Sequence, residues 1–171
     1  MNSVFGELVE FRMGRNTTRQ DNKTGIYSLD DFYDDLYGRN GDVCEDFKIA
    51  VSLTKNKSTV MSQKTVKKEL SSIFLIGCPN VKIVDPWYFC YLFNEDKGVS
   101  EQMRRLQQGT FGCIAKLNVK TISMIEASIQ PLEKQVVIGK TYREMLRNIR
   151  LRREQADNMS LFMLETLKKL N

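Results

Sequence analysis

The last part of the chain, residues 131–171, carries a heptad pattern with no proline after Pro131. Apolar positions recur at alternating spacings of four and three, which is typical of a helix that pairs with another helix. Eight of the ten seam positions are apolar, and the full seam is Ile138, Tyr142, Met145, Ile149, Arg152, Ala156, Met159, Met163, Thr166 and Leu170. We predict a long helical arm and expect its eight apolar seam residues to be dimerisation positions.

The length of this helix constrains how it can be covered. A helix of this size is a rod of roughly 50 Å, whereas a domain made of residues 1–130 has a diameter of roughly 30–40 Å. The arm is therefore too long to pack along its own domain, and an exposed apolar seam needs a partner.

The preceding residues alternate between strand and helix patterns. Apolar residues alternate over 49–53, and two buried strands are expected at 73–76 and 81–84 with a turn at 78–80. Asp85 and Pro86 together are a strong helix start, and a second helix is expected from Ser100 to Gly109. We predict an α+β head over residues 1–130, with a mixed, mostly antiparallel sheet and short helices, followed by the coiled-coil arm over residues 131–171.

Several function classes are disfavoured by composition. The chain has no histidine, which removes Ser-His-Asp and Cys-His catalysis and nearly all histidine metal sites. Four cysteines form no Cys-x-x-Cys pair, and we expect Cys78, Cys90 and Cys113 to be buried free thiols rather than disulfide or metal partners. We expect no enzyme activity, cofactor or metal. No apolar run approaches the ~18 residues of a membrane span, and no signal peptide is evident, so a cytoplasmic protein is expected.

The net charge of +5 is unevenly distributed. Residues 30–46 are strongly acidic, whereas residues 55–68 contain five lysines and no acid, and a smaller basic cluster lies within residues 12–23. This separation predicts one basic face suited to phosphate contact. The alternative is a solvated loop, which is what most charge runs are. Polar residues within the basic segment could read base edges, namely Asn56, Ser58, Thr59, Ser62 and Gln63.

Five short motifs in order give the chain a family resemblance. They are residues 5–11 leading to Gly14, the Gly-Asp-Val step at 41–43, the Asp-Pro entry to an aromatic helix at 85–92, Gly109-Thr110 with Leu117-Asn118, and Pro-Leu-Glu-Lys-Gln at 131–135. Together they resemble the specificity subunit of type I restriction-modification enzymes. The chain departs from that family at Gln130, where a proline is common, and its head is shorter. A full specificity subunit has two recognition domains and two arms, whereas this chain has one of each.

The resemblance implies a target recognition domain that binds double-stranded DNA without catalysis and directs a methyltransferase subunit to a bipartite target. With one head per chain, a homodimer of antiparallel arms through the C-terminal helix is expected to read an inverted repeat. The expected DNA contacts are Arg12, Arg15, Asn16, Arg19, Lys55, Lys57, Lys64, Lys67, Arg104 and Arg105. The alternative is an interaction protein that keeps the arm, does not read DNA, and pairs with another specificity fragment or a methyltransferase subunit.

Overall fold

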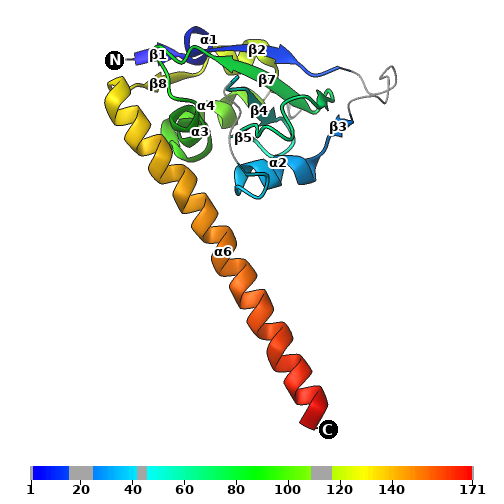
Figure 1. The fold of residues 1–171 in the computed structure, drawn as a ribbon. Helices are drawn as coiled ribbons and strands as arrows, with labels where there is room; N and C mark the ends of the chain where they lie inside the picture. The colour runs from blue at the N-terminus through cyan, green and yellow to red at the C-terminus, as the bar shows by residue number, and fades with distance from the viewer. Residues whose placement is uncertain (1, 16–24, 42–45, 109–116, 171) are drawn as a thin grey trace.

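The computed structural model describes residues 2–15, 25–41, 46–108 and 117–170. Figure 1 shows a head from which one long helix, the arm, extends well beyond the other elements. Asn16, Arg19, Cys113, the Asp-Val step at 42–43 and Gly109-Thr110, all of which carry expectations from the sequence, lie outside the described residues.

The two ends of the head meet at the base of the arm. The first elements are β1 (Asn2–Val4), α1 (Phe5–Leu8) and β2 (Val9–Met13), and β1 pairs antiparallel with β8 (Glu126–Ser128). The backbone N–H of Phe5 also donates to the carbonyl of Ile125 at 2.9 Å. The strand that opens the chain therefore lies beside the strand that leads into the arm (Figure 1).

The centre of the head is a four-stranded antiparallel sheet with strand order β2-β7-β4-β5. Its other strands are β4 (Ile49–Ser52), β5 (Lys57–Val60) and β7 (Phe74–Pro79). A short parallel pair, β3 (Ile26–Tyr27) with β6 (Glu69–Leu70), lies in a separate two-stranded sheet. The predicted architecture, mixed and mostly antiparallel strands with short helices and then a long helix, is confirmed.

Helices cover opposite faces of the central sheet. On one face, Phe11 of β2 meets Phe89 of α3 (Pro86–Glu95), with ring centroids 6.0 Å apart. On the other face, Phe74 stacks with Phe32 of α2 (Leu29–Leu36) at 5.9 Å. Phe11 pairs with Gly77 on β7, and positions 74 and 77 point to opposite sides of a strand because side chains alternate. Most of α3 is buried, as its apolar sequence predicted.

Capping residues set the ends of the helices. Asp85 accepts a hydrogen bond from the N–H of Tyr88 at 2.8 Å, so the predicted start of α3 is confirmed. Asn118 caps α5 (Val119–Ser123) in the same way, accepting from Thr121 at 3.0 Å. Between these two helices, α4 (Lys97–Gln107) begins three residues earlier than predicted. Its cap is Asp96, not Ser100, and Asp96 accepts a hydrogen bond from the N–H of Val99.

Three other sequence predictions are wrong. Residues 81–84 form turns rather than a strand, because β7 continues through Cys78 and Pro79 where a turn was expected. The basic segment, residues 55–68, is not an open loop, because β5 runs through it. Ser58 and Thr59 of β5 are buried, and so is the nearby Ser62, so these three residues are no longer candidates for reading bases. Among the cysteines, Cys90 is buried as predicted, but Cys78 is exposed.

The arm is α6 (Leu132–Leu170), and its first half packs on the head, mainly against α3. Gln135, Gly139, Tyr142 and Leu146 are its buried residues, at spacings of four, three and four. This packing corrects the expectation that the arm would not lie along its own domain. The remainder projects away, and every residue from 155 to 170 is exposed. Among the helices that the structure describes, none is both long enough and apolar enough to cross a membrane.

Candidate nucleic-acid interface and pairing surface

The described cations that were predicted to bind DNA do not form a single cluster. Arg12 and Arg15 lie at the end of β2. Together with Lys48 and Lys68, which line the same pocket, they form what we call the edge group. A second set, the turn group, lies where the β4–β5 turn meets the end of α4, two segments joined by hydrogen bonds of 3.3 Å between the amides of Asn56 and Gln107. The turn group comprises Lys55, Lys57, Arg104 and Arg105. Lys64 and Lys67 are exposed in the segment between β5 and β6.

Most of the turn group is already engaged with acceptors of the head. Lys57 donates to the carbonyl of Asn94 at 2.9 Å and to the carboxylate of Glu95 at 3.2 Å. Arg104 and Arg105 both pair with Glu101, whose pKa is lowered chiefly by the hydrogen bond from Arg105. Carboxylates this close reduce the positive potential that these side chains present to DNA. Within the turn group, only Lys55 is exposed and has no carboxylate partner among the described residues.

The edge group surrounds a pocket of about 370 Å³. The structure adds two cations to it that we had not selected as DNA contacts, Lys48 and Lys68, which line the same pocket as Arg12 and Arg15. Lys48 immediately precedes β4, and its carbonyl accepts from the N–H of Met61 at 2.8 Å. The sequence signal for Lys48 was weak, because it stands alone between an acidic segment and a strand.

Two of these four cations have carboxylate partners. Arg12 donates to Glu10 at 2.8 Å, and that hydrogen bond is the main cause of a raised Arg12 pKa. Lys68 donates to both carboxylate oxygens of Asp31, at 2.8 and 2.9 Å. Burial acts to raise the pKa of Asp31, but hydrogen bonds from Lys68 and Ser28 outweigh it and lower that pKa. Arg15 and Lys48 have no carboxylate partner within the part of the chain that the structure describes.

The predicted pairing seam needs one correction, at Tyr142. Its side chain is 4% exposed, and its hydroxyl donates to Glu95 at 2.9 Å and accepts from the amide of Asn94 at 3.0 Å. Tyr142 therefore fixes the arm to the head and is not available to a partner. Ile138 is partly buried against the same core. Ile138 and Met145 each directly precede a buried residue of the arm, Gly139 and Leu146, so these two seam positions lie roughly 100° around the helix from the buried ones.

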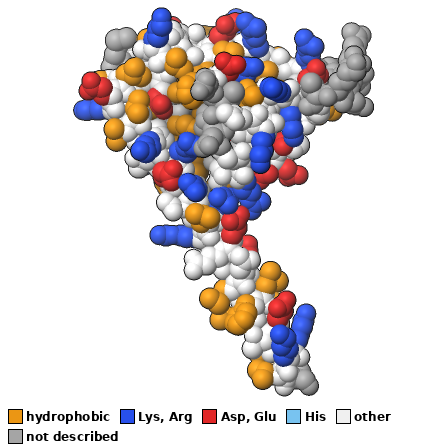
Figure 2. All heavy atoms as spheres, viewed as in Figure 1, with side chains coloured by type: hydrophobic (Ala, Val, Ile, Leu, Met, Phe, Trp, Pro, Cys, Tyr) orange, Lys and Arg blue, Asp and Glu red, His pale blue; other side chains and the backbone are white. Residues whose placement is uncertain are grey.

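The rest of the seam is open. The exposed fractions of Met145, Met159, Met163 and Leu170 are 43%, 52%, 58% and 79%, and Ala156 is also exposed. Ile149 is half-buried. Figure 2 shows hydrophobic side chains gathered on the part of the arm that projects beyond the head. A continuous apolar surface on a projecting helix is a strong indication of a contact with another chain.

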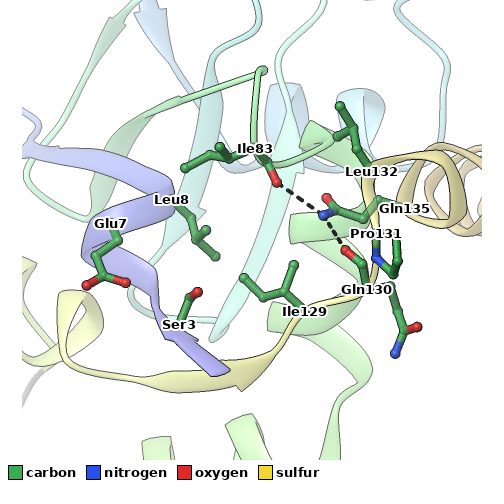
Figure 3. Close-up of a pocket in the computed structure, with 9 residues that line it drawn as sticks. All are labelled: Ser3, Glu7, Leu8, Ile83, Ile129, Gln130, Pro131, Leu132 and Gln135. Carbon is green, nitrogen blue, oxygen red and sulfur yellow. Dashed lines mark hydrogen bonds between the residues drawn. The ribbon is translucent and has the colours of Figure 1, made fainter. Parts of the chain in front are cut away.

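A side chain of the fifth motif holds the joint between head and arm (Figure 3). Gln135 donates to the carbonyls of Ile83 at 3.1 Å and Gln130 at 2.8 Å, and its oxygen accepts from the N–H of Asp85 at 2.9 Å. It lies at the rim of a pocket of about 430 Å³ between α1 and the start of α6. Further along the arm, Glu154 pairs with Arg39 at 2.9 Å, which adds to the contacts that Gln135 and Tyr142 make between head and arm.

The described residues contain no group of three or more His, Cys, Asp or Glu side chains placed to hold a metal ion. What the arrangement offers instead is polar and charged binding surface on the head and an apolar surface on the arm.

Two solved structures share this fold. One is a chain from a study of complex assembly and conformational transition of the type I R-M system, with a TM-score of 0.64, 14% identity, and coverage of 96% of this chain and 43% of that chain. The other is the HsdS subunit from Thermoanaerobacter tengcongensis, with a TM-score of 0.64, 13% identity, and coverage of 97% and 47%. No protein-family model and no curated protein matches the sequence. The chain spans less than half of the length of either structure, and its fold is similar to that of one such portion of an HsdS subunit.

Proposed function

We propose that this protein is a DNA-binding specificity subunit of a type I restriction-modification system, which acts as a homodimer and directs a methyltransferase subunit to a bipartite target. The observation that carries the proposal is the combination of one head with one arm whose apolar seam is open along its projecting half. The protein is non-catalytic in this role.

The proposed dimer has two-fold symmetry through the seams of two antiparallel arms, which places the heads at opposite ends. An arm of 39 residues is about 58 Å long. Because one turn of DNA is about 34–36 Å, this length corresponds to roughly one and a half turns between the two half-sites. Each head then contacts one half of an inverted repeat.

A second candidate function is favoured by the ion pairs around the head cations. Because Arg12, Lys57 and Lys68 all have carboxylate partners, the head has less free positive charge than its sequence indicated. An interaction protein that pairs through its arm and does not read DNA fits this observation. It would bind DNA only at low salt and without preference among sequences.

The pairing seam is tested by the mass of the purified chain, measured by size-exclusion chromatography with light scattering. We expect the wild-type chain to be a dimer and the double variant Met159→Asp/Met163→Asp to be a monomer. Both residues lie beyond the head, so the substitutions leave the head intact. Leu161→Asp is the control: it introduces one aspartate, against two in the double variant, into the same stretch but lies on the opposite side of the helix from the seam. A wild-type monomer would contradict the homodimer.

DNA recognition is tested by selecting bound sequences from a random duplex library at physiological salt. Enrichment of one sequence by the wild-type chain supports the specificity function. Binding without any enrichment supports the interaction protein instead. The same selection with the monomeric double variant separates reading by one head from reading by the dimer.

A further inference from the structure

We propose that the edge-group pocket is where the head reads DNA, with Glu69 accepting a hydrogen bond from the amino group of a base while Arg15 and Lys48 hold the flanking phosphates. This rests on the proposed function and goes beyond it, because it assigns the residues that read and those that position. Glu69 was not among the predicted DNA contacts.

The pocket has the construction of a site rather than of a scattered charged surface. Its lining combines apolar side chains with the four cations and one carboxylate. The apolar side chains are Met13, Met61, Val66, Leu70 and Ile76. Apolar walls with a few placed polar groups are the usual composition of a binding pocket, because the walls exclude water and the polar groups fix the orientation.

The backbone holds Arg15 firmly at the rim. Its N–H donates to the carbonyl of Leu70 at 2.8 Å, and it forms a parallel bridge with Ser71. The preceding residue, Gly14, is needed for this approach, because a Cβ there would lie 2.6 Å from the carbonyl oxygen of Leu70. The chain therefore presents Arg15 from a fixed position, which lowers the entropy lost when it binds.

Arg15 and Lys48 are the members of the group with unused charge. Arg12 and Lys68 are held by Glu10 and Asp31, so phosphate would have to compete with those carboxylates. Among the described residues, Arg15 and Lys48 have no such competitor, and a cation with no partner gains most from a phosphate. We assign the backbone contacts to these two.

Glu69 is the feature that distinguishes reading from simple phosphate binding. It is half-buried in a pocket with four cations, yet it forms no ion pair with any of them among the described residues. A carboxylate repels phosphate, so in a DNA-bound pocket it is stable only if it faces a donor. In the major groove, the donors are the amino groups of cytosine and adenine, and Glu accepting from cytosine N4 is a recurrent contact.

The test is sequence selection from a random duplex library by the full-length wild-type chain and by Glu69→Gln, Arg15→Ala and Lys48→Ala. We expect Glu69→Gln to change the preferred base at one position of each half-site, towards adenine, because glutamine both donates to and accepts from adenine. Arg15→Ala and Lys48→Ala are expected to select the wild-type sequence with weaker binding. Each should reduce the slope of log affinity against log salt by about 0.9.

Glu126→Gln is the matched control, since Glu126 is an exposed glutamate of the same head that lies on β8, outside the pocket. Denaturant unfolding of each variant verifies that the head is intact. An unchanged sequence preference in Glu69→Gln overturns this inference alone, provided that the wild type selects a sequence. A wild type that selects none overturns the proposed function, and the inference with it.

Discussion

Gln135 is the residue on which the junction between head and arm depends. Its amide contacts three backbone groups from two segments, and its side chain is almost completely buried. All three hydrogen bonds are partly buried, and a partly buried backbone group that loses its partner costs free energy, so one side chain that satisfies three such groups has a large effect. Gln135 is part of the motif at 131–135, but its structural role depends on contacts with residues that are distant in sequence and meet only in the folded chain.

The first prediction concerns Gln135→Ala. This variant leaves the N–H of Asp85 and two carbonyls without their partner, and we expect it to lower the free energy of unfolding by about 2–3 kcal/mol. Denaturant unfolding followed by circular dichroism measures the change. The control is Gln155→Ala on the exposed part of the same helix, which should change stability by less than about 0.5 kcal/mol. Equal effects from the two variants would refute the role given to Gln135.

The second prediction concerns the thiols. Burial raises the pKa of Cys90 to about 12, so almost no thiolate exists there at pH 8. Because the thiolate is the reactive form, we expect iodoacetamide to label exposed Cys78 and to spare Cys90 in the native protein. Peptide mapping by mass spectrometry reads out each site, and labelling in denaturant shows that Cys90 can react once it is unfolded. Rapid native labelling of Cys90 would mean that the core around α3 opens readily.

The crossing of α3 and α6 is the central contact at the scale of elements. Gly139 lets the two helices approach, because a Cβ there would lie 2.7 Å from the backbone nitrogen of Tyr88 and 3.1 Å from Cβ of Trp87. Glycine normally weakens a helix by about 1 kcal/mol relative to alanine. At this position close packing outweighs that cost, which explains why an otherwise strong helix contains a glycine.

The third prediction is that Gly139→Ala lowers the free energy of unfolding by about 1–3 kcal/mol despite the better helix propensity of alanine. Gly98→Ala in α4 is the matched control, because a Cβ at Gly98 meets only a side-chain oxygen of Asp96 at 3.2 Å. That variant should be neutral or stabilising by up to about 1 kcal/mol. Thermal unfolding of both distinguishes packing from propensity, and a stabilised Gly139→Ala would disprove the close contact.

Elements with a local signal were predictable from sequence, and those defined by pairing were not. Asp85-Pro86 and Asn118 mark helix starts because capping involves neighbours only three residues away. The residues at 81–84 have an apolar pattern but pair with no strand among the described residues, and the chain turns there instead. Strand β5 was not predicted in the lysine-rich segment, because pairing with β4 across a short turn outweighed the polar composition of that segment.

At the scale of the whole molecule, the candidate site brings together residues far apart in sequence. Arg12 and Arg15 were predictable as basic residues near a loop, but Lys48 and Glu69 enter the same pocket only because strands of the central sheet and β6 lie side by side. The charge pattern of the sequence predicted a basic surface on the head. It predicted neither the carboxylates that pair with Lys57 and Lys68 nor the position of the pocket.

The fourth prediction concerns the symmetry of the target. If two chains pair through their seams with a two-fold axis, the sequences selected by the wild-type chain should be inverted repeats. Inserting five base pairs between the half-sites turns one half-site to the other side of the duplex, and we expect this to abolish specific binding. Gel-shift titrations of the two duplexes measure the difference. Equal affinity for both would contradict a rigid two-headed arrangement.

The projecting end of the arm has a further consequence for how the molecule assembles. Residues 155–170 are all exposed, and an isolated helix of that length is only marginally stable in water. In the proposed dimer, folding of these last turns is therefore coupled to association, and their ordering is part of the free energy of assembly. Affinity between chains then depends on every residue that favours helix in this stretch, including those that touch no partner, so exposed positions of the arm can tune assembly without altering the interface.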